Sequence, residues 1–318
     1  MKTCPVIIAL ITFLFAQELV ASETKKIYIG GILGFNWSFN ELLEDNENLS
    51  DYAWENLDVS PITVGCEYAY DFLSISYQTS PFKRQIGKLY LTNNELLIRS
   101  SITYQKPYKL VKSDSDREGP GWDDDYNYKE YNAYSFNNYG EIGYLFTYDF
   151  FIFNKMSYKM LFMHNEFQKP GPGLGILTSI AYNYSTFRSK DILIPEGERE
   201  FFNRCGTFKG DKVFTIGPQI TPIASYVFEN FYIGIGYSMM IMPYQKGKIY
   251  TDVENFKLSG KDRLITNLFI TAGLKANNVM FSGYFGTEMY KTYELPYEDD
   301  IIFNESIGNF ELRAGVLF

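Results

Sequence analysis

Hydrophobic and polar residues alternate along the last nine positions of the chain, Phe310–Phe318. One face of an extended strand would carry Phe310, Leu312, Ala314, Val316 and Phe318, and the other Glu311, Arg313 and Gly315, with only Leu317 breaking the pattern. A terminal amphipathic strand that ends on an aromatic residue is typical of outer-membrane barrels, in which the apolar face meets lipid and the polar face lines a lumen. The pattern therefore predicts a membrane-spanning strand that closes a barrel and leaves no edge.

Segments with the same period of two recur along the chain. They are Leu96–Tyr104, Ile142–Phe150, Leu174–Tyr182, Phe231–Met239 and Leu264–Leu274. Small residues such as Gly234, Gly236 and Gly273 fall on the opposite faces, which suits the interior of a narrow barrel. The fold class predicted is all-β: an antiparallel transmembrane β-barrel of about ten strands with long extracellular loops, with strand positions in residues 25–85 left open.

The connections between these segments alternate in length. Long polar stretches are Lys112–Asn138, Ser185–Asp211, Tyr244–Asp262 and Tyr290–Asn304, and short breaks are Phe153–Lys155, Glu229–Asn230 and Lys275–Asn278. Outer-membrane barrels place long loops outside the cell and short turns in the periplasm. A soluble β-sandwich or a lipocalin-like barrel would share the period of two, and the loop alternation and the terminal Phe318 favour the membrane barrel.

The first residues resemble a secretory signal peptide. Met1-Lys2 gives a positive start, Pro5–Ala16 is apolar, and the small residues Ala21 and Ser22 follow. The apolar run is too short for a spanning helix and is followed by the charged Glu18, which argues against a retained anchor. We predict a signal peptide over residues 1–22, a single barrel domain over residues 23–318, and location in the cell outer membrane.

Composition and charge narrow the function classes. The chain holds 27 Tyr and 27 Phe, a load that barrels concentrate in girdles at the two membrane interfaces. A net charge of −9 argues against nucleic acid and is compatible with acidic outer loops that attract cations. His164 is the only histidine, so a multi-histidine zinc site is excluded, and no metal site is predicted. Cys66 and Cys205 are the cysteines beyond the signal peptide, and nothing in their spacing requires a disulfide.

The most distinctive polar motif consists of three consecutive carboxylates, Asp123-Asp124-Asp125, followed by Tyr126. Closely spaced carboxylates repel one another, and one can then keep its proton near neutral pH. In that arrangement Asp123 and Asp125 would hold and activate a water molecule. The alternative is a solvated acidic loop with weak calcium affinity.

From about Leu96 to the C-terminus the chain resembles the omptin family of outer-membrane proteases. The resemblance is carried by an ordered series of segments: Asp123–Tyr126, Tyr134–Gly140, Ile220–Tyr226, Glu229–Phe231 and Ile270–Leu274. It implies a ten-stranded barrel whose active-site groove opens at the cell surface, with Asp123 and Asp125 as catalytic candidates. It also implies dependence on lipopolysaccharide, with no other cofactor.

The histidine of the omptin catalytic Asp–His pair has no counterpart at the matching position. That position follows the Phe231–Ile241 strand, and Pro243–Asp252 contains no histidine. Asp252 or Glu254 would have to replace it, or else His164, which follows a predicted strand over Tyr158–Phe162. Most isolated histidines are surface residues, and loss of a general base typically costs a factor of about 10² to 10⁴ in rate.

Three functions follow from these observations. The preferred one is an omptin-like surface barrel whose acidic groove binds basic peptides or host and surface proteins without standard proteolysis. The alternatives are an active omptin-type endopeptidase that uses Asp123 and Asp125 to activate water, and a structural barrel or small channel. Outer-membrane lipid is a partner in every case, and nucleic acid in none.

Overall fold

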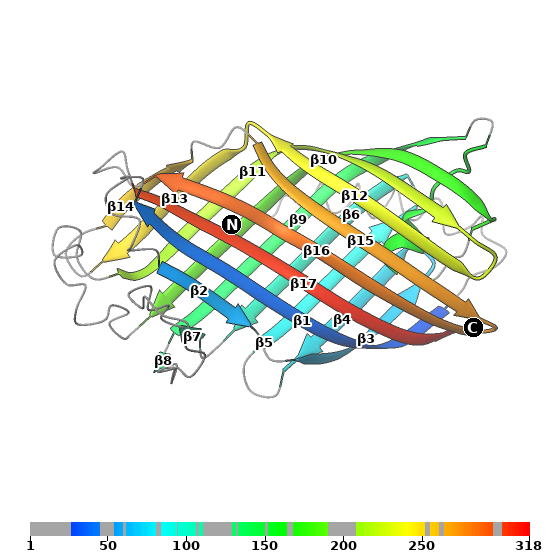
Figure 1. Cartoon of the computed structure of the whole chain (residues 1–318), viewed down its shortest axis with the longest axis horizontal. Helices are drawn as coiled ribbons and strands as arrows, with labels where there is room; N and C mark the ends of the chain where they lie inside the picture. Colours follow the sequence, from blue (N-terminus) through cyan, green and yellow to red (C-terminus); the bar gives the residue numbers. More distant parts are fainter. Residues whose placement is uncertain are drawn as a thin grey trace, which may run out of the picture.

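Twelve antiparallel strands close into a barrel (Figure 1). Around the wall they follow the order β1, β3, β4, β5, β6, β9, β10, β11, β12, β15, β16 and β17, and β17 pairs with β1 to complete the ring. The computed structural model describes residues 27–44, 54–59, 62–80, 84–93, 95–105, 108–110, 129–131, 133–149, 152–163, 168–189, 208–251, 255–260, 264–294 and 301–318.

The wall strands differ widely in length. They are β1 (Ile27–Glu44), β3 (Thr63–Tyr70), β4 (Leu73–Thr79), β5 (Arg84–Thr92), β6 (Leu96–Gln105), β9 (Ala133–Tyr148), β10 (Gly171–Ser189), β11 (Phe208–Val227), β12 (Phe231–Ile241), β15 (Leu264–Ala276), β16 (Val279–Glu294) and β17 (Ile301–Leu317). Strands that pair with the wall at one end are β2 (Trp54–Val59), β13 (Tyr244–Thr251) and β14 (Asn255–Gly260). A separate two-stranded sheet joins β7 (Tyr108–Leu110) to β8 (Lys129–Tyr131), and a π-helix, η1 (Lys159–Met163), lies between β9 and β10.

The two ends of the barrel differ in their connections. We call the end that holds Ile27 and Phe318 the basal end; there the Phe318 amide donates to the Ile27 carbonyl at 2.9 Å. Two-residue turns join β3 to β4 and β15 to β16 at this end. Asp71 and Asn277 begin these turns with φ of 48° and 55°, a left-handed conformation that Asp and Asn tolerate. Strands β6 and β10 end, and β9 and β11 begin, at the opposite, distal end.

The predicted alternation of faces is confirmed. Ile235 and Tyr237 of β12 are exposed on the outer wall, whereas Tyr232 and Ser238 of the same strand are buried inside. Phe318 is 70% exposed and points away from the lumen. Soluble proteins rarely expose continuous apolar surfaces of this size, so the outer wall is the lipid-facing surface of a membrane barrel.

The predicted number of ten strands is wrong, because the chain forms twelve. Residues 25–85, where strand positions were left open, contain the wall strands β1, β3 and β4 and the start of β5. Strand β4 has only seven residues, with Ile75 and Tyr77 outward and Ser74 and Ser76 inward. Short strands joined by a two-residue turn carry too few repeats for the period to be read from the sequence.

The prediction of a short turn at Phe153–Lys155 and a strand at Tyr158–Phe162 is also wrong. Residues 149–170 form one long connection between β9 and β10. Within this connection lies the π-helix η1 (Lys159–Met163). Residues 156–160 read Met-Ser-Tyr-Lys-Met and alternate over five positions, as a short strand would. The four residues Met160–Met163 that follow are all apolar and buried, because this segment is enclosed by the barrel and has no outer face.

The stretch Tyr244–Asp262, predicted as a loop, instead contains β13 and β14. Met242 has a φ of 45°, and the six residues from Met239 to Tyr244 oppose the five from Ile220 to Ile216. This extra residue is a β-bulge, which shifts the outward positions from odd numbers in β12 to even numbers in β13. Pro243 and the bulge interrupt the alternation of apolar and polar residues. The pattern read from the sequence therefore stops at the end of β12, and β13 is taken for a loop.

A charge on the outer wall should destabilise the barrel according to its depth. We expect Ile220→Arg, an outward position in the middle part of β11, to lower the free energy of unfolding by about 2–4 kcal/mol, and Ile233→Arg, which pairs with Tyr226 near the basal end, by at most about 1 kcal/mol. Equilibrium denaturant unfolding in phospholipid vesicles measures both values. Equal effects at the two positions would contradict the assignment of this wall to the membrane.

Candidate functional site: an occupied lumen

Asp123, Asp125, Asp252 and His164 lie outside the residues that the structure describes, as do Glu254 and Cys205. Their proposed roles therefore stay predictions, and so does the signal peptide over residues 1–22. Cys66 is described and is exposed on the outer wall, on β3. The part of the molecule whose geometry can be built residue by residue is the lumen.

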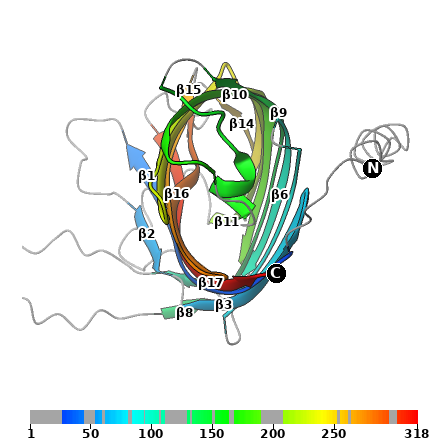
Figure 2. The same cartoon turned by 90° about the vertical axis from the view of Figure 1, so that its right-hand side faces the viewer.

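A segment of the β9–β10 connection fills the basal lumen. Figure 2 views the barrel from the basal end and shows this segment inside the ring of strands. We call residues 156–163 the plug. Met156, Tyr158, Met160, Leu161 and Met163 are fully buried. A fully buried side chain of this kind stabilises by roughly 1.5–3 kcal/mol, so the plug is held as firmly as a domain core.

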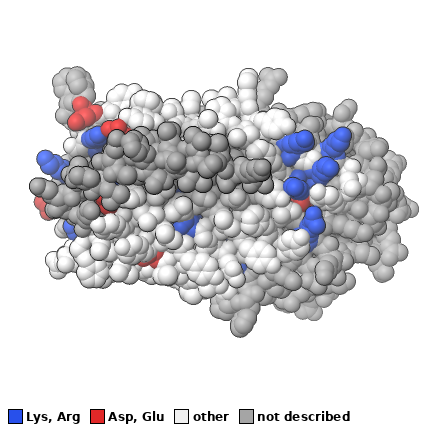
Figure 3. Space-filling model, turned by 180° about the vertical axis from the view of Figure 1, so that it is seen from behind, with Lys and Arg blue, Asp and Glu red and all other residues white. Residues whose placement is uncertain are grey.

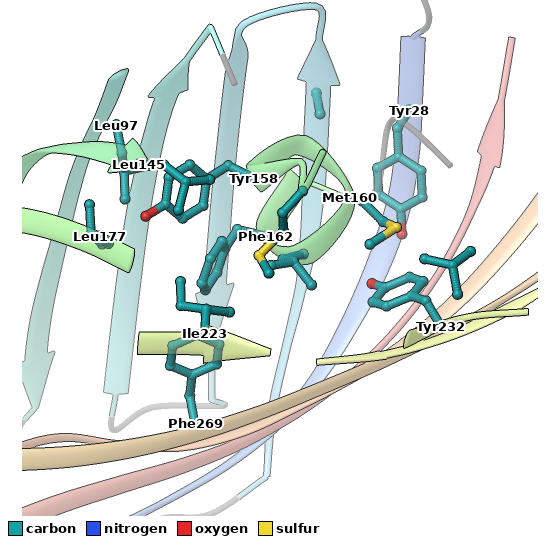
Figure 4. Packing of buried hydrophobic residues seen from close by; sticks show 14 of the residues in the cluster. Tyr28, Leu97, Leu145, Tyr158, Met160, Phe162, Leu177, Ile223, Tyr232 and Phe269 are labelled. Carbon is teal, nitrogen blue, oxygen red and sulfur yellow. The ribbon is translucent and has the colours of Figure 1, made fainter. Parts of the chain in front are cut away.

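Aromatic rings join the plug to the wall. The ring of Phe162 lies 5.2 Å from that of Phe269 on β15, 5.6 Å from Tyr158 and 6.3 Å from Tyr90 on β5, measured between centroids. Figure 4 shows the surrounding side chains, which project inward from strands on opposite sides of the barrel. They include Leu97, Leu145, Leu177, Ile223 and Tyr232. The basal lumen is therefore apolar, which explains why Leu317 breaks the alternation of the last strand and points inward.

Polar contacts tie the plug backbone to the wall as well. The Thr271 hydroxyl donates to the Leu161 carbonyl at 3.2 Å, and Arg313 Nη1 donates to the Phe162 carbonyl at 3.5 Å. At the basal entrance Lys159 Nζ lies 3.0 Å from Asp71 Oδ1. The carbonyls in the last turn of a helix have no partner within it, and these wall residues satisfy two of them.

Above the plug, four charged side chains form the first of two ionic networks. Arg313 Nη2 donates to Glu311 Oε2 at 2.6 Å, and its Nη1 lies 3.4 Å from Glu67 Oε2. Lys88 Nζ and Gln78 Nε2 both donate to Glu311 Oε1, at 2.7 and 2.8 Å. The network joins β3, β4, β5 and β17, and its two carboxylates balance its two cations.

The second network centres on Glu141 of β9. Arg99 of β6 forms an ion pair with Glu141 Oε2, and the same oxygen accepts a hydrogen bond from the Tyr139 hydroxyl at 3.0 Å. Ser179 and Gln219 donate to Glu141 Oε1 at 2.6 and 3.0 Å. The guanidinium of Arg99 also lies 4.8 Å from the centre of the Tyr139 ring.

The chemistry of these networks is structural. Each of the three carboxylates in these networks, Glu67, Glu141 and Glu311, is paired with a cation, and each also accepts at least one hydrogen bond. A carboxylate in that state is a poor general base, because its lone pairs are already engaged. Buried charges of this kind are retained only when they are paired. In the described part of the lumen, these ion pairs and hydrogen bonds therefore serve to connect strands of the wall.

A closed sheet, an apolar outer wall and a polar, internally paired lumen define an outer-membrane β-barrel protein. In this class short turns usually face the periplasm and long connections face outward. None of the described residues forms a helix long and apolar enough to cross a membrane.

Comparison with known proteins adds similarity of fold. No protein-family model and no curated protein matches the chain. Among solved structures it is similar to the outer membrane protease OmpT from Escherichia coli, with 11% identity, 94% of this chain and 99% of that chain covered, and a TM-score of 0.42. It is also similar to the Pseudomonas putida toluene transporter TodX (8% identity, 95% and 91% covered, TM-score 0.32) and to Neisserial surface protein A (7%, 92% and 99%, 0.27).

Removing one member of the first network should leave an uncompensated buried charge. We expect Arg313→Met to lower the free energy of unfolding by about 3–5 kcal/mol, because Glu67 and Glu311 would then face Lys88 alone. The double variant Arg313→Met/Glu67→Gln restores charge balance and should recover part of the loss. Denaturant unfolding of the refolded barrel measures both, and a double variant no more stable than the single one would contradict the charge argument.

Proposed function

We propose that this protein is a surface-exposed, non-conducting outer-membrane barrel that binds basic peptides or other cationic ligands with its distal loops. One observation carries the proposal: the lumen is filled by the plug and by the two ionic networks. A barrel of about eight strands is filled by its side chains, whereas conducting porins use about 16. Twelve strands leave room to spare, and this chain fills it with its own residues 156–163.

The distribution of charge supports ligand binding at the distal end. The lumen networks contain three carboxylates (Glu67, Glu141 and Glu311) and three cations (Lys88, Arg99 and Arg313), so their sum is zero. The net charge of −9 therefore arises elsewhere in the chain. The Asp114–Asp125 segment between β7 and β8 contains five aspartates and Glu118 against one arginine, Arg117. Such a segment attracts cationic ligands and raises their rate of association.

The plug should keep the barrel closed to ions. We expect the wild-type protein in planar lipid bilayers to show no steady conductance. Replacing residues 156–163 with a Gly-Ser linker removes the apolar filling and should produce open channels. Steady conductance in the wild-type protein would contradict the proposal.

A second variant guards against misfolding of the linker protein. Phe162→Ala keeps the plug backbone but removes the ring that contacts Phe269 and Tyr158, and we expect brief openings where the wild type has none. Lys159→Ala, which removes only the ion pair with Asp71 at the entrance, serves as the milder comparison. An unchanged, silent Phe162→Ala barrel would show that the plug is not what closes the lumen.

Binding of basic peptides should depend on the acidic motif. We expect Asp123→Asn/Asp125→Asn to weaken the binding of a peptide with paired Lys/Arg residues about tenfold at low salt, and less at high salt, because exposed charges are screened. Fluorescence anisotropy of a labelled peptide with the refolded protein measures the change. Asp149→Asn, at the basal end, is the matched control. Equal binding by all three proteins would contradict the proposal, and peptide cleavage lost in Asp125→Asn would establish the endopeptidase instead.

A further inference from the structure

Three amide side chains of the distal lumen have polar atoms without hydrogen-bond partners. The amide nitrogen and oxygen of Asn183 on β10 and of Gln245 on β13 have none among the residues that the structure describes, and neither has Oε1 of Gln219 on β11. Each of these residues is at least nine-tenths buried. Buried polar atoms are nearly always hydrogen-bonded, because an unmade bond there is costly. These amides therefore mark a place where another molecule completes the bonding.

The strand register brings the three amides into one neighbourhood. Asn183 pairs directly with Thr215 of β11, and Thr215 pairs directly with Gln245. Adjacent strands lie about 4.8 Å apart, so the two amides are about 9–10 Å apart along the wall, with a buried hydroxyl between them. Gln219 lies four positions from Thr215 on the same inward face of β11. Polar groups from three neighbouring strands thus line one stretch of the lumen, which we call the amide site.

The amide site lies far from the basal end. Asn183 is 12 positions beyond Gly171, the basal start of β10. That span measures about 40 Å along the strand and about 30 Å along the axis of a barrel whose strands tilt by roughly 40°. Since the hydrocarbon core is about 30 Å thick, the site lies near the distal surface of the membrane. The plug and the ionic networks fill the lumen on its basal side, so a ligand would enter and leave from the distal end.

The charges around the amide site are either outside the barrel or already engaged. Figure 3 views the barrel from behind and shows Lys and Arg clustered toward the right of the molecule. Exposed basic residues on the outer face of these strands are Arg188, Lys212 and Lys248. Inside, Arg99 is paired with Glu141, and Asp211 also has an interaction partner. A neutral ligand fits these surroundings, whereas a charged one would bury a charge without a counter-ion.

An apolar surface adjoins the amides. A buried apolar cluster is formed by Tyr139, Ala181, Met240 and Ile265. Ala181 lies two positions basal of Asn183 on the inward face of β10, and a Cβ at Gly217 would lie only 3.0 Å from the Met240 side chain. Met240 therefore packs over β11 between Thr215 and Gln219. Sites for small molecules typically combine such an apolar lining with a few placed polar groups.

We propose that the amide site binds a neutral sugar. An amide donates through its nitrogen and accepts through its oxygen, and a sugar hydroxyl does both, so each partner satisfies the other. A sugar ring also presents C–H groups on its faces, which match the apolar cluster, and it carries no charge. The site goes beyond the peptide binding proposed for the distal loops and does not depend on it, since Asp123 and Asp125 are not among its residues.

Sugar binding by the refolded full-length barrel tests the proposal. The probes are glucose, galactose, maltose and lactose, titrated by calorimetry in a detergent that has no sugar headgroup, with cyclohexanol as a ring that has a single hydroxyl. We expect at least one sugar to bind and cyclohexanol not to bind, because a site built for hydroxyls rejects an analogue that lacks them. Asn183→Leu/Gln245→Met should weaken sugar binding at least about tenfold.

Matched variants separate the amide site from other causes. Asn255→Leu/Gln85→Met makes the same two side-chain changes at exposed positions and should bind as the wild type does. Asp123→Asn/Asp125→Asn should also keep full sugar binding, even where it loses peptide binding. Sugar binding lost in Asp123→Asn/Asp125→Asn and kept in Asn183→Leu/Gln245→Met would overturn the proposal.

A comparison of stabilities guards against misfolding. Without sugar, Asn183→Leu/Gln245→Met should unfold at the same or a higher denaturant concentration than the wild type, because no hydrogen bond within the protein is lost. With saturating sugar only the wild type should gain stability. A less stable variant without sugar would show that the amides are bonded within the protein and would overturn the proposal. So would binding of none of the four sugars, or tighter binding of N-acetyl-triglycine amide, which would reassign the amides to a peptide backbone.

Discussion

Closure of the hydrogen-bonded sheet is the constraint on which the structure depends. Hydrocarbon offers no partner for a backbone amide or carbonyl, so each wall strand must be paired on both sides. The pairing of β17 with β1, which extends from Tyr28 opposite Leu317 to Glu44 opposite Ile301, meets this requirement at the seam. Successive side chains along each wall strand then point alternately to the lipid and to the lumen. The alternation of apolar and polar residues in the sequence follows from that geometry.

A closed ring also encloses space, which is occupied by water in large barrels and here by the chain's own residues. Where the wall projects leucine and tyrosine inward, at the basal end, the apolar plug occupies the space; where it projects charged residues, the carboxylates and cations neutralise one another across the lumen. Gly236 on the wall makes room for this filling. The Cβ of any other residue at that position would collide with the ring of Phe269, which contacts the plug. The filled interior leaves the distal end and the outer wall as the surfaces open to partners.

Periodicity was sufficient to predict the class of fold, the outward rows of β9, β10, β12 and β15, and the terminal aromatic residue at the surface. It was insufficient for strands as short as β4, and for the plug, whose residues have no outer face. The partners of the inward charges were beyond prediction as well: Glu311 contacts Lys88 and Gln78, more than 200 positions earlier, and only the closed register brings them together. The candidates Asp123 and Asp125 belong to the connection between β7 and β8, for which the sequence supplies residue types but no period.

Arg313 connects the seam, the ionic network and the plug. It belongs to the final strand, yet its guanidinium contacts Glu67 on β3, Glu311 beside it and the Phe162 carbonyl on the plug. These contacts span up to about 250 positions, and long-range contacts form late because the closure entropy of the intervening chain must first be overcome. The last strand therefore does more than close the wall: its arrival neutralises Glu67 and supplies the donor for a plug carbonyl at the same time. Closing the barrel and sealing its lumen are consequently coupled through one side chain.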